Sequence, residues 1–375
     1  MTKTFKTYIE IILLIITGFS PLLPQPIKAV LVLILFILNL KYAKRLDKKK
    51  LFTLGVFMYL FILNFIYDLS NISAVDQINI LSFYFPLCFL LGFLISQKYS
   101  IKEYLYYYEK VIFIIAIFSL IGVALYIFFP DLLWNLPEYN YYHTNHKTAF
   151  LFNILISGNS IVKRNAGIAW EPGAFQFLLN LGLYSYIENN EKINLFRVAI
   201  YAMAIIFTRS TAGLIIFLLV TFKIFMDDKK ARVLIIMSVL IFSVPIIEEL
   251  FYQIRYKLVG SYAFNIRLQP FLNAFNIGKN YFLGMGNSGF DIYYRNKTTP
   301  PWDSIGQIFI RYGYVMLIYI LFTLSNLLKQ YKLLFFILLI TFFSQNIWFF
   351  SLVTPFYFYG ISCYDINKSA NKSQG

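Results

Sequence analysis

The sequence predicts an all-α protein, a polytopic membrane helix bundle of about 11 or 12 transmembrane helices with two long extracytoplasmic loops. Hydrophobic residues make up 59% of the 375-residue chain and charged residues only 14%, against about 25% in soluble proteins. The mean hydropathy is +0.65. The apolar residues gather in runs, most of which approach the roughly 20 residues that cross a bilayer. This composition excludes a disulfide scaffold and a disordered chain.

Each predicted span is an apolar run between polar connectors. The runs lie at about residues 9–19, 27–40, 51–67, 78–96, 111–129, 172–187, 195–208, 212–226, 233–247, 305–328 and 333–363. The first run ends at Pro21 without an Ala-x-Ala site, so we expect a span and no cleavable signal peptide. The last run contains Pro355 and is either one bent helix or two short ones, which leaves both span counts open.

The basic residues predict the orientation. The connector 41–50 is rich in Lys and Arg, and the other connectors on the same side are also basic. Positive charge gathers on the cytoplasmic side, so the N-terminus is predicted to be cytoplasmic. The formal net charge of +15 has the same explanation, and no nucleic-acid partner is expected.

Two long polar stretches then fall outside, the first outer loop at 130–170 and the second at 248–303, within a single integral membrane domain of residues 1–375. Loops of this length are often functional. The cytoplasmic connectors are too short for a nucleotide-binding domain, and the sequence has no Walker A, G-x-G-x-x-G or Asp-x-Asp motif. An enzyme of this kind would act at the outer face on a substrate that arrives already activated.

Charged residues at the outer ends of the predicted spans are functional candidates, because a charge near the membrane is costly. Glu171 opens one helix with Pro172 at its first position, shortly after Arg164. This pattern fits a plain helix start, and it equally fits an Arg and Glu pair that lines a polar cavity. Arg209 lies in a very short connector between two apolar runs, and we favour a functional role for it.

The second outer loop and the helix after it contain the other candidates. Arg267 lies within the loop, and Gly284 and Gly286 permit a tight turn whose N–H groups could form an anion-binding nest. Asp303 is either the N-cap of the next helix or a carboxylate at the mouth of a cavity. Arg311 follows about two turns deeper on the same helix face. It is predicted to be a buried cation that needs a partner, either Asp303 through a bridging group or a ligand phosphate.

Several arginines at one membrane face predict an anionic ligand, because guanidinium stays charged and grips phosphate with two parallel hydrogen bonds. Either Asp303 or Glu171 could act as the general base. His143 and His146 are interpreted as surface residues, and neither a metal site nor a cofactor is predicted. Outer aromatic residues either stack on sugar rings or form the interfacial belt. These are Trp134, Tyr139, Tyr141, Tyr142, Trp170 and Trp302.

Motifs in order over roughly residues 160–320 resemble the O-antigen polymerase family, the Wzy-like polymerases of oligosaccharide repeat units. That family tends to show an Arg, a Gly-containing stretch and Glu-Pro-Gly at a helix start, then a Ser/Arg/Thr-small-residue helix start. An Arg followed by Gly-x-Gly comes next, and then a polar pair before a helix with Gly. The matching residues are Arg164, Gly167 and Glu171-Pro172-Gly173; Arg209-Ser210-Thr211-Ala212-Gly213; Arg267, Gly284 and Gly286; and Asp303-Ser304 and Gly313.

The resemblance implies a metal-independent, GT-C-like membrane glycosyltransferase in the bacterial plasma (inner) membrane. It would polymerise lipid-linked oligosaccharide repeat units into O-antigen or capsule at the outer face. The donor would be a glycan on undecaprenyl pyrophosphate, and the acceptor a sugar hydroxyl of another lipid-linked repeat. A flippase and a chain-length regulator are the implied protein partners. The arginines and glycines of the motifs would bind the pyrophosphate, and Asp303 or Glu171 would be catalytic.

Three alternatives are weighed against this function. Related O-antigen ligases place a His-Asn-like pair where this chain has Trp302-Asp303, which favours a polymerase and leaves the base unsettled. A lipid-linked oligosaccharide flippase or other transporter would place ionisable residues deep in several helices and often shows internal repeats. A membrane O-acyltransferase would use a His in or beside a helix, whereas both His here lie in one outer loop.

Overall fold

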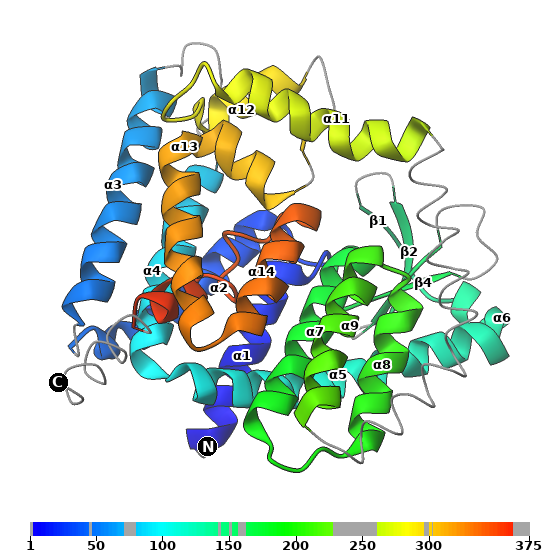
Figure 1. Cartoon of the computed structure of the whole chain (residues 1–375). Coiled ribbons are helices and arrows are strands. Elements are labelled where there is room, and N and C mark those ends of the chain that lie inside the picture. The colour runs from blue at the N-terminus through cyan, green and yellow to red at the C-terminus, as the bar shows by residue number, and fades with distance from the viewer. Residues whose placement is uncertain are drawn as a thin grey trace. The chain divides into compact units, whose positions relative to one another are not determined.

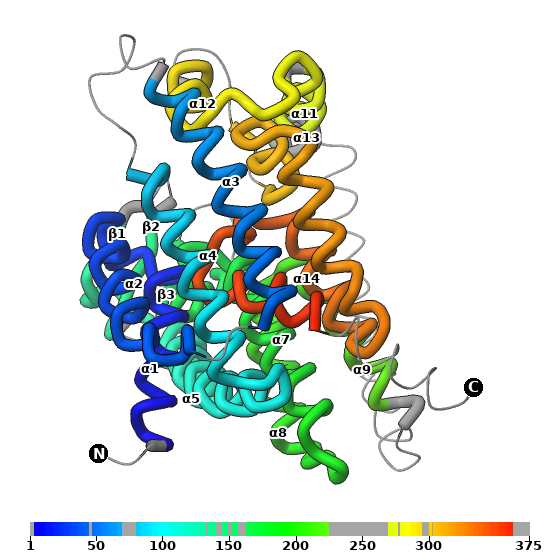
Figure 2. Tube along the Cα trace, turned by 90° about the vertical axis from the view of Figure 1, so that its left-hand side faces the viewer, coloured from blue at the N-terminus to red at the C-terminus, as the bar shows by residue number. Residues whose placement is uncertain are grey.

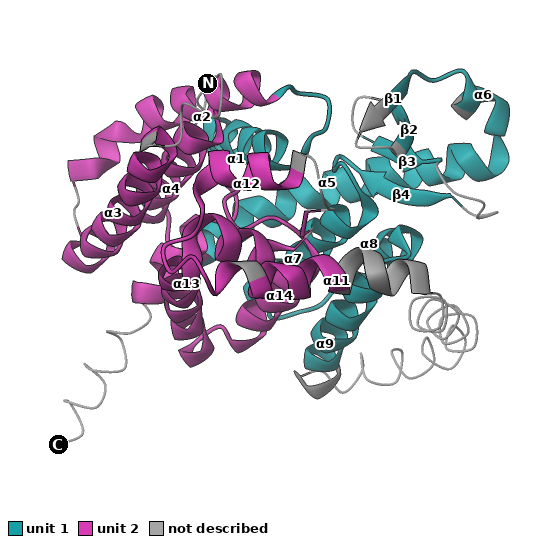
Figure 3. Cartoon of the chain, turned by 90° about the horizontal axis from the view of Figure 1, so that it is seen from above, with its two compact units in different colours: residues 1–24, 102–255 teal, residues 25–101, 256–375 magenta. Residues whose placement is uncertain are grey.

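The computed structural model describes residues 3–44, 47–70, 80–141, 144–149, 152–156, 163–227, 261–295, 300–301 and 303–362. These parts of the chain are mainly helical and include one small antiparallel sheet (Figure 1). The sequence predicts one membrane domain, and the fold has two compact units. Unit 1 comprises residues 1–24 and 102–255, and unit 2 comprises residues 25–101 and 256–375 (Figure 3).

Unit 1 is built around a helix that is buried on every side. Its helices are α1 (Lys3–Phe19), α5 (Ile101–Phe128), α6 (Pro130–Trp134), α7 (Pro172–Asn189), α8 (Leu195–Thr208) and α9 (Thr211–Asp227). Every residue of α7 from Pro172 to Ile187 is buried, and α7 packs on α8 and α9. A helix that is apolar all round belongs in a core. The NH2 group of Asn180 links two of these helices, because its Nδ2 donates to the Gly213 carbonyl of α9 at 3.1 Å.

The segment 130–170, which the sequence predicts as the first outer loop, contains regular structure that was not expected. Four antiparallel strands pair in chain order, β1 (Glu138–Tyr141), β2 (Thr144–Ala149), β3 (Phe152–Leu155) and β4 (Arg164–Gly167). Phe152 and Ile154 of β3 are buried with Val123 of α5. Because β3 alternates its side chains between two faces, both residues reach this apolar contact from one face. The sheet is thereby anchored to the end of α5.

In unit 2, α2 (Gln25–Asn39), α3 (Lys48–Ser70) and α4 (Leu81–Lys98) pack beside one another, and α13 (Ser304–Ser325) also packs against α3 (Figure 2). The unit also contains η1 (Leu40–Lys44), α11 (Ser261–Gly278), α12 (Gly286–Arg295), η3 (Asn326–Lys329) and α14 (Lys332–Ser344). Rings from several helices of the unit form the core, where Phe89 stacks on Tyr357 at 5.3 Å between centroids and Phe57 packs beside both. The helix α12 lies against α3 and α13.

Among the described residues, five helical segments are long and apolar enough to cross a membrane: Gln25–Lys44, Lys48–Leu69, Leu81–Lys98, Ile101–Phe128 and Ser304–Lys329. The prediction of a helical membrane protein is therefore confirmed at this coarse level. Leu195–Thr208, Thr211–Ile224 and Lys332–Ser344 are apolar but shorter. The predicted span at 233–247 lies outside the described residues. The full count of 11 or 12 spans stays a prediction.

The last predicted run divides into two helices, which is one of the two expected outcomes. The helix α14 ends at Ser344, residues 345–354 are not helical, and a second helix covers 355–362. Gln345 is extended, and its carbonyl accepts hydrogen bonds from the backbone N–H and the hydroxyl of Ser304. Pro355 then stands at the first position of the new helix, where a missing N–H has no cost.

Candidate functional site

In unit 2, Arg311 of α13 places its guanidinium among polar groups of α12. Only 6% of the residue is exposed. Its Nε donates to Oε1 of Gln307 at 2.8 Å and one NH group donates to Oδ1 of Asn287 at 2.8 Å. The guanidinium carbon lies 3.7 Å from the centroid of the Phe290 ring, which is cation–π geometry. These three partners are neutral, so they fix the position of the cation without neutralising it.

The carboxylate of Asp291 is an ionic partner of Arg311 in this cluster. Its Oδ1 lies 3.6 Å from the second NH group, and its side chain is 42% exposed. That distance is too long for a good hydrogen bond, and solvent screens a pair of this kind. The sequence predicted a partner for Arg311 through Asp303 or a ligand phosphate. In the described structure Arg311 contacts the amides of Gln307 and Asn287 and the carboxylate of Asp291, and a pairing with Asp303 or a ligand phosphate stays a prediction.

Tyr294 of α12 adds a hydroxyl to the same cluster. Burial raises the pKa of Tyr294 above its ordinary value, Arg311 lowers it and Asp303 raises it. The hydroxyl is therefore protonated at neutral pH and able to donate. Among the described residues its oxygen has no hydrogen-bond partner. The sequence carried no signal for this residue, because it is one of 30 tyrosines.

The predicted glycine-rich nest is present, and a carboxylate of the chain itself lies in it. Gly286 has a φ of 76°, and the next two backbone N–H groups, of Asn287 and Ser288, donate to Asp68 at 3.3 and 3.0 Å. The hydroxyl of Ser82 donates to the same carboxylate at 2.9 Å. Asp68 is 2% exposed and lies in α3. Asp68 is not among the candidates predicted from the sequence, although an acid at the end of an apolar run is a signal for a functional residue.

Gly284 has a different function in the fold, which is to let two backbone segments cross. Its φ is 80°, and a Cβ there would collide with the carbonyl of Arg311. Gly313, with a φ of 76°, interrupts α13 at the same crossing. Between them the N–H of Met285 donates to the carbonyl of Ile310 at 2.8 Å. Any larger residue at either glycine would force α13 away from the loop before α12.

Asp303 adopts the N-cap conformation that the sequence offered as one alternative. Its Oδ1 accepts from the N–H of Gly306 at 2.6 Å, and the residue is buried. This bond satisfies one of the unpaired N–H groups at the start of α13. Capping therefore fixes the carboxylate at the head of the helix that carries Arg311, two turns further on.

In unit 1 the structure brings Arg164 and Arg209 together. Arg164 belongs to β4, and its Nε and NH groups donate to the carbonyls of Thr208 and Arg209 at 3.1 and 3.4 Å. These carbonyls are at the C-terminal end of α8, where a cation is stabilising. The backbone of Arg209 itself adopts the left-handed helical conformation, with a φ of 50°. This conformation is uncommon for a residue with a side chain and is often found at functional sites.

Glu171 begins α7 with Pro172 at the first position, as predicted, but without the expected cap. Glu171 is extended, partly buried, and makes no capping hydrogen bond with the helix. Its neighbour Trp170 stacks on Phe19 at 5.5 Å between centroids. The ring of Trp170 therefore packs within unit 1, and its role in sugar stacking or in the interfacial belt stays a prediction.

The remaining candidates have separate outcomes. His146 was interpreted as a surface residue, and this is wrong, because β2 is a central strand and His146 is only 1% exposed. Burial lowers the pKa of His146 to about 4, so it is neutral at pH 7. Arg267 lies in α11, and its side chain is outside the described part of the structure. His143, Tyr142 and Trp302 also lie outside the described residues.

The candidates thus form two sets. In unit 2, Asp303, Arg311, Gly284 and Gly286 gather around the start of α12 and the head of α13. In unit 1, Arg164 and Arg209 meet at the end of α8. Within the described ranges no three His, Cys, Asp or Glu residues gather as metal ligands. Each set combines a permanent cation with polar groups, which suits an anionic or hydroxyl-rich ligand.

Comparisons with known proteins identify no relative of the chain. The chain matches no protein-family model, and neither curated proteins nor solved structures show significant similarity to it.

Proposed function

We propose that this protein polymerises lipid-linked oligosaccharide repeat units into surface polysaccharide at the outer face of the plasma membrane. The donor is a glycan on undecaprenyl pyrophosphate, and the acceptor is a hydroxyl on the terminal sugar of another lipid-linked repeat. The bond between the donor sugar and the pyrophosphate breaks, a glycosidic bond forms, and undecaprenyl pyrophosphate leaves. Supporting this proposal are the membrane-length helices, the order of the motifs, and the chemistry of the two sets of site residues.

The observation that carries the proposal is the buried guanidinium of Arg311. It lies in a membrane-length helix, where the neutral side chains of Gln307 and Asn287 accept its hydrogen bonds and the carboxylate of Asp291 lies 3.6 Å away. A buried cation costs free energy unless a partner offsets it, so such a residue is functional by default. A pyrophosphate oxygen is a partner of the right charge, and it gains charge as the glycosyl bond breaks.

The other residues follow from this assignment. Asp303 is our first choice for the base that takes the proton of the acceptor hydroxyl, because the cap bond fixes it on the same helix as Arg311. Glu171 is the second choice, because it stands partly buried at the start of α7. We assign Arg164, Arg209 and Arg267 to binding of the lipid-linked substrate, whereas the backbone at Gly284 and Gly286 holds α12 against α13 and Asp68.

The test is polymer formation by purified protein in vesicles that contain the lipid-linked repeat unit. We expect Arg311→Ala to lower polymer yield at least about 100-fold, the typical loss when one donor to a developing anion is removed. Arg311→Lys should recover part of it, since lysine keeps the charge but not the two parallel hydrogen bonds. Arg197→Lys is the matched control, because Arg197 is an ion-paired arginine of unit 1 outside both sets.

Gels of surface glycan from cells separate the alternatives. Loss of the long ladder in Arg311→Ala, with single repeats still reaching the surface, supports polymerisation. Repeats trapped on the cytoplasmic side would indicate a flippase, and long polymer retained on the lipid carrier would indicate a ligase. A normal ladder at normal protein level would refute the role of Arg311.

A further inference from the structure

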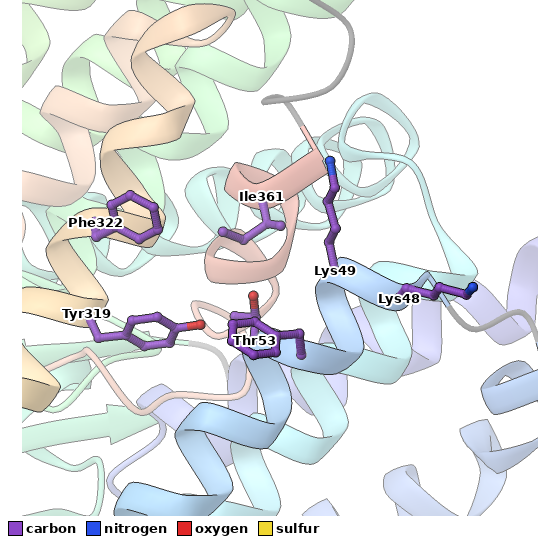
Figure 4. Close-up of a pocket in the computed structure, with 7 residues that line it drawn as sticks. Lys48, Lys49, Thr53, Tyr319, Phe322 and Ile361 are labelled. Carbon is purple, nitrogen blue, oxygen red and sulfur yellow. The ribbon is translucent and has the colours of Figure 1, made fainter. Parts of the chain in front are cut away.

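Unit 2 has an open groove at the end opposite to the Arg311 cluster. Its volume is about 290 Å³, and α3, α13 and the helix 355–362 supply its lining (Figure 4). Thr53 of α3 is 15 residues before Asp68, which places the two about 22 Å apart along the helix. The groove is therefore distinct from the candidate catalytic cluster.

The walls of the groove are apolar and face outward. Phe52 and Phe322 line it and are 71% and 54% exposed, and Ile361 closes one side. The hydroxyls of Thr53 and Tyr319 point toward each other at its floor (Figure 4). Because α3 and α13 are both long enough to cross a membrane, exposed aromatic residues on them are suited to lipid rather than to water. The volume is at the low end of ligand pockets, which suits a segment of an acyl chain.

Two lysines stand at the rim of this groove. Lys48 and Lys49 line it and are exposed, with their amines directed outward in Figure 4. The third lysine of the run, Lys50, turns inward, where its Nζ donates to the Ser96 carbonyl and lies 5.5 Å from the centroid of the Tyr359 ring. The rim cations stand in the first turn of α3, where the helix dipole disfavours positive charge. Asp47 caps this helix end by accepting from the N–H of Lys49, and a lipid phosphate would add a second anion close to the two lysines.

We propose that this groove binds an anionic phospholipid of the bilayer. One acyl chain lies against Phe52 and Phe322, and the headgroup phosphate lies between Lys48 and Lys49. The groove requires a ligand with both an acyl chain and an anionic headgroup. A soluble phosphate would not contact the apolar walls, and a zwitterionic lipid would gain less binding energy from the two lysines at the rim. In the predicted orientation this end faces the cytoplasmic leaflet, whose surface is negative.

The test is lipid retention by the full-length protein, measured by native mass spectrometry after reconstitution in mixed phosphatidylglycerol and phosphatidylethanolamine. The rim variant is Lys48→Gln with Lys49→Gln. The charge-matched control is Lys41→Gln with Lys44→Gln, two exposed lysines of η1 that do not line the groove. Each lysine near an anionic lipid contributes about five-fold to the affinity for that lipid, so the rim variant should lose roughly 25-fold in affinity for phosphatidylglycerol.

A second variant tests the apolar wall without changing charge. Thr53→Phe fills the floor of the groove and should also reduce retention of phosphatidylglycerol. Equal losses in the rim variant and the control would overturn the proposal in favour of general surface charge. So would equal retention of the two lipids by the wild-type protein, or full retention by Thr53→Phe. Because polymer formation is not the readout, the outcome is independent of the proposed function.

Discussion

Replacing Asp68 with alanine removes the acceptor of three buried hydrogen bonds that join α3 to α4 and to the start of α12. The donors are the Ser82 hydroxyl and the N–H groups of Asn287 and Ser288. The carboxylate is 2% exposed, so water cannot easily replace it. We therefore expect α12, the helix that positions Phe290 against Arg311, to separate from α3 far more often in the variant.

The magnitude follows from the three bonds. A hydrogen bond to a charged group contributes about 1.5–3 kcal/mol, and the contact at 3.3 Å lies at the weak end of that range. Allowing for relaxation and non-additivity, the local loss is about 3–5 kcal/mol. Because 1.36 kcal/mol is a factor of ten, opening of α12 should become at least roughly 100-fold more frequent.

The assay is hydrogen–deuterium exchange of residues 284–295 in detergent. Asp68→Ala should speed exchange there by at least about 100-fold, and Asp68→Asn by less, because the amide keeps one acceptor oxygen. Asp47→Ala is the control: Asp47 accepts from the N–H of Lys49 at 2.9 Å at the exposed start of α3 and should leave α12 unchanged. Unaltered protection of α12 in Asp68→Ala would refute the reasoning.

Three further predictions concern stability, read as thermal midpoints in detergent. Gly313→Ala should lower the free energy of unfolding by at least about 2 kcal/mol, because its φ is 76° and a Cβ would meet neighbouring backbone. The control is Gly55→Ala, where a Cβ would have nothing within 4 Å, and it should leave the free energy of unfolding unchanged or raise it by up to about 1 kcal/mol. Arg197→Ala should cost about 2–3 kcal/mol by leaving the buried Glu109 without its 2.8 Å partner, and a change below about 0.5 kcal/mol would contradict this. His146 binds a proton near pH 6.5 when unfolded but only near pH 4 when folded, so about 2–3 kcal/mol should be lost as pH falls from 6.5 to 4. A His146→Gln variant should lack this dependence, and equal pH profiles would count against it.

The apolar helices could be predicted because a membrane requires long uninterrupted apolar runs. The run 195–208 coincides with α8, and 212–226 differs from α9 by one residue at each end. The sheet could not be predicted in this way. Strands such as β2, with the sequence TNHKTA, lack an apolar alternation, so their pairing depends on neighbours rather than on their own pattern.

The candidate site was predictable where it depends on local chain geometry. The cap at Asp303 and the proline start after Glu171 follow from residues next to one another. The partners of Arg311 do not follow from adjacent residues, because Asn287 reaches it from another helix and carries no charge. The partners of Asp68 were the hardest to predict, because nothing near it in the chain indicates which N–H groups donate to its carboxylate.

The bond between Asp68 and Asn287 also has a consequence for biosynthesis, because its two residues are 219 positions apart. At about 5–20 residues per second, Asn287 is synthesised roughly 10–45 seconds after Asp68. Residues 102–255 of unit 1 are made in that interval, before the second half of unit 2 exists. During this interval the carboxylate of Asp68, at the end of an apolar helix, lacks the N–H donors of Asn287 and Ser288. An insertion factor or headgroup water has to solvate it until those residues have been synthesised.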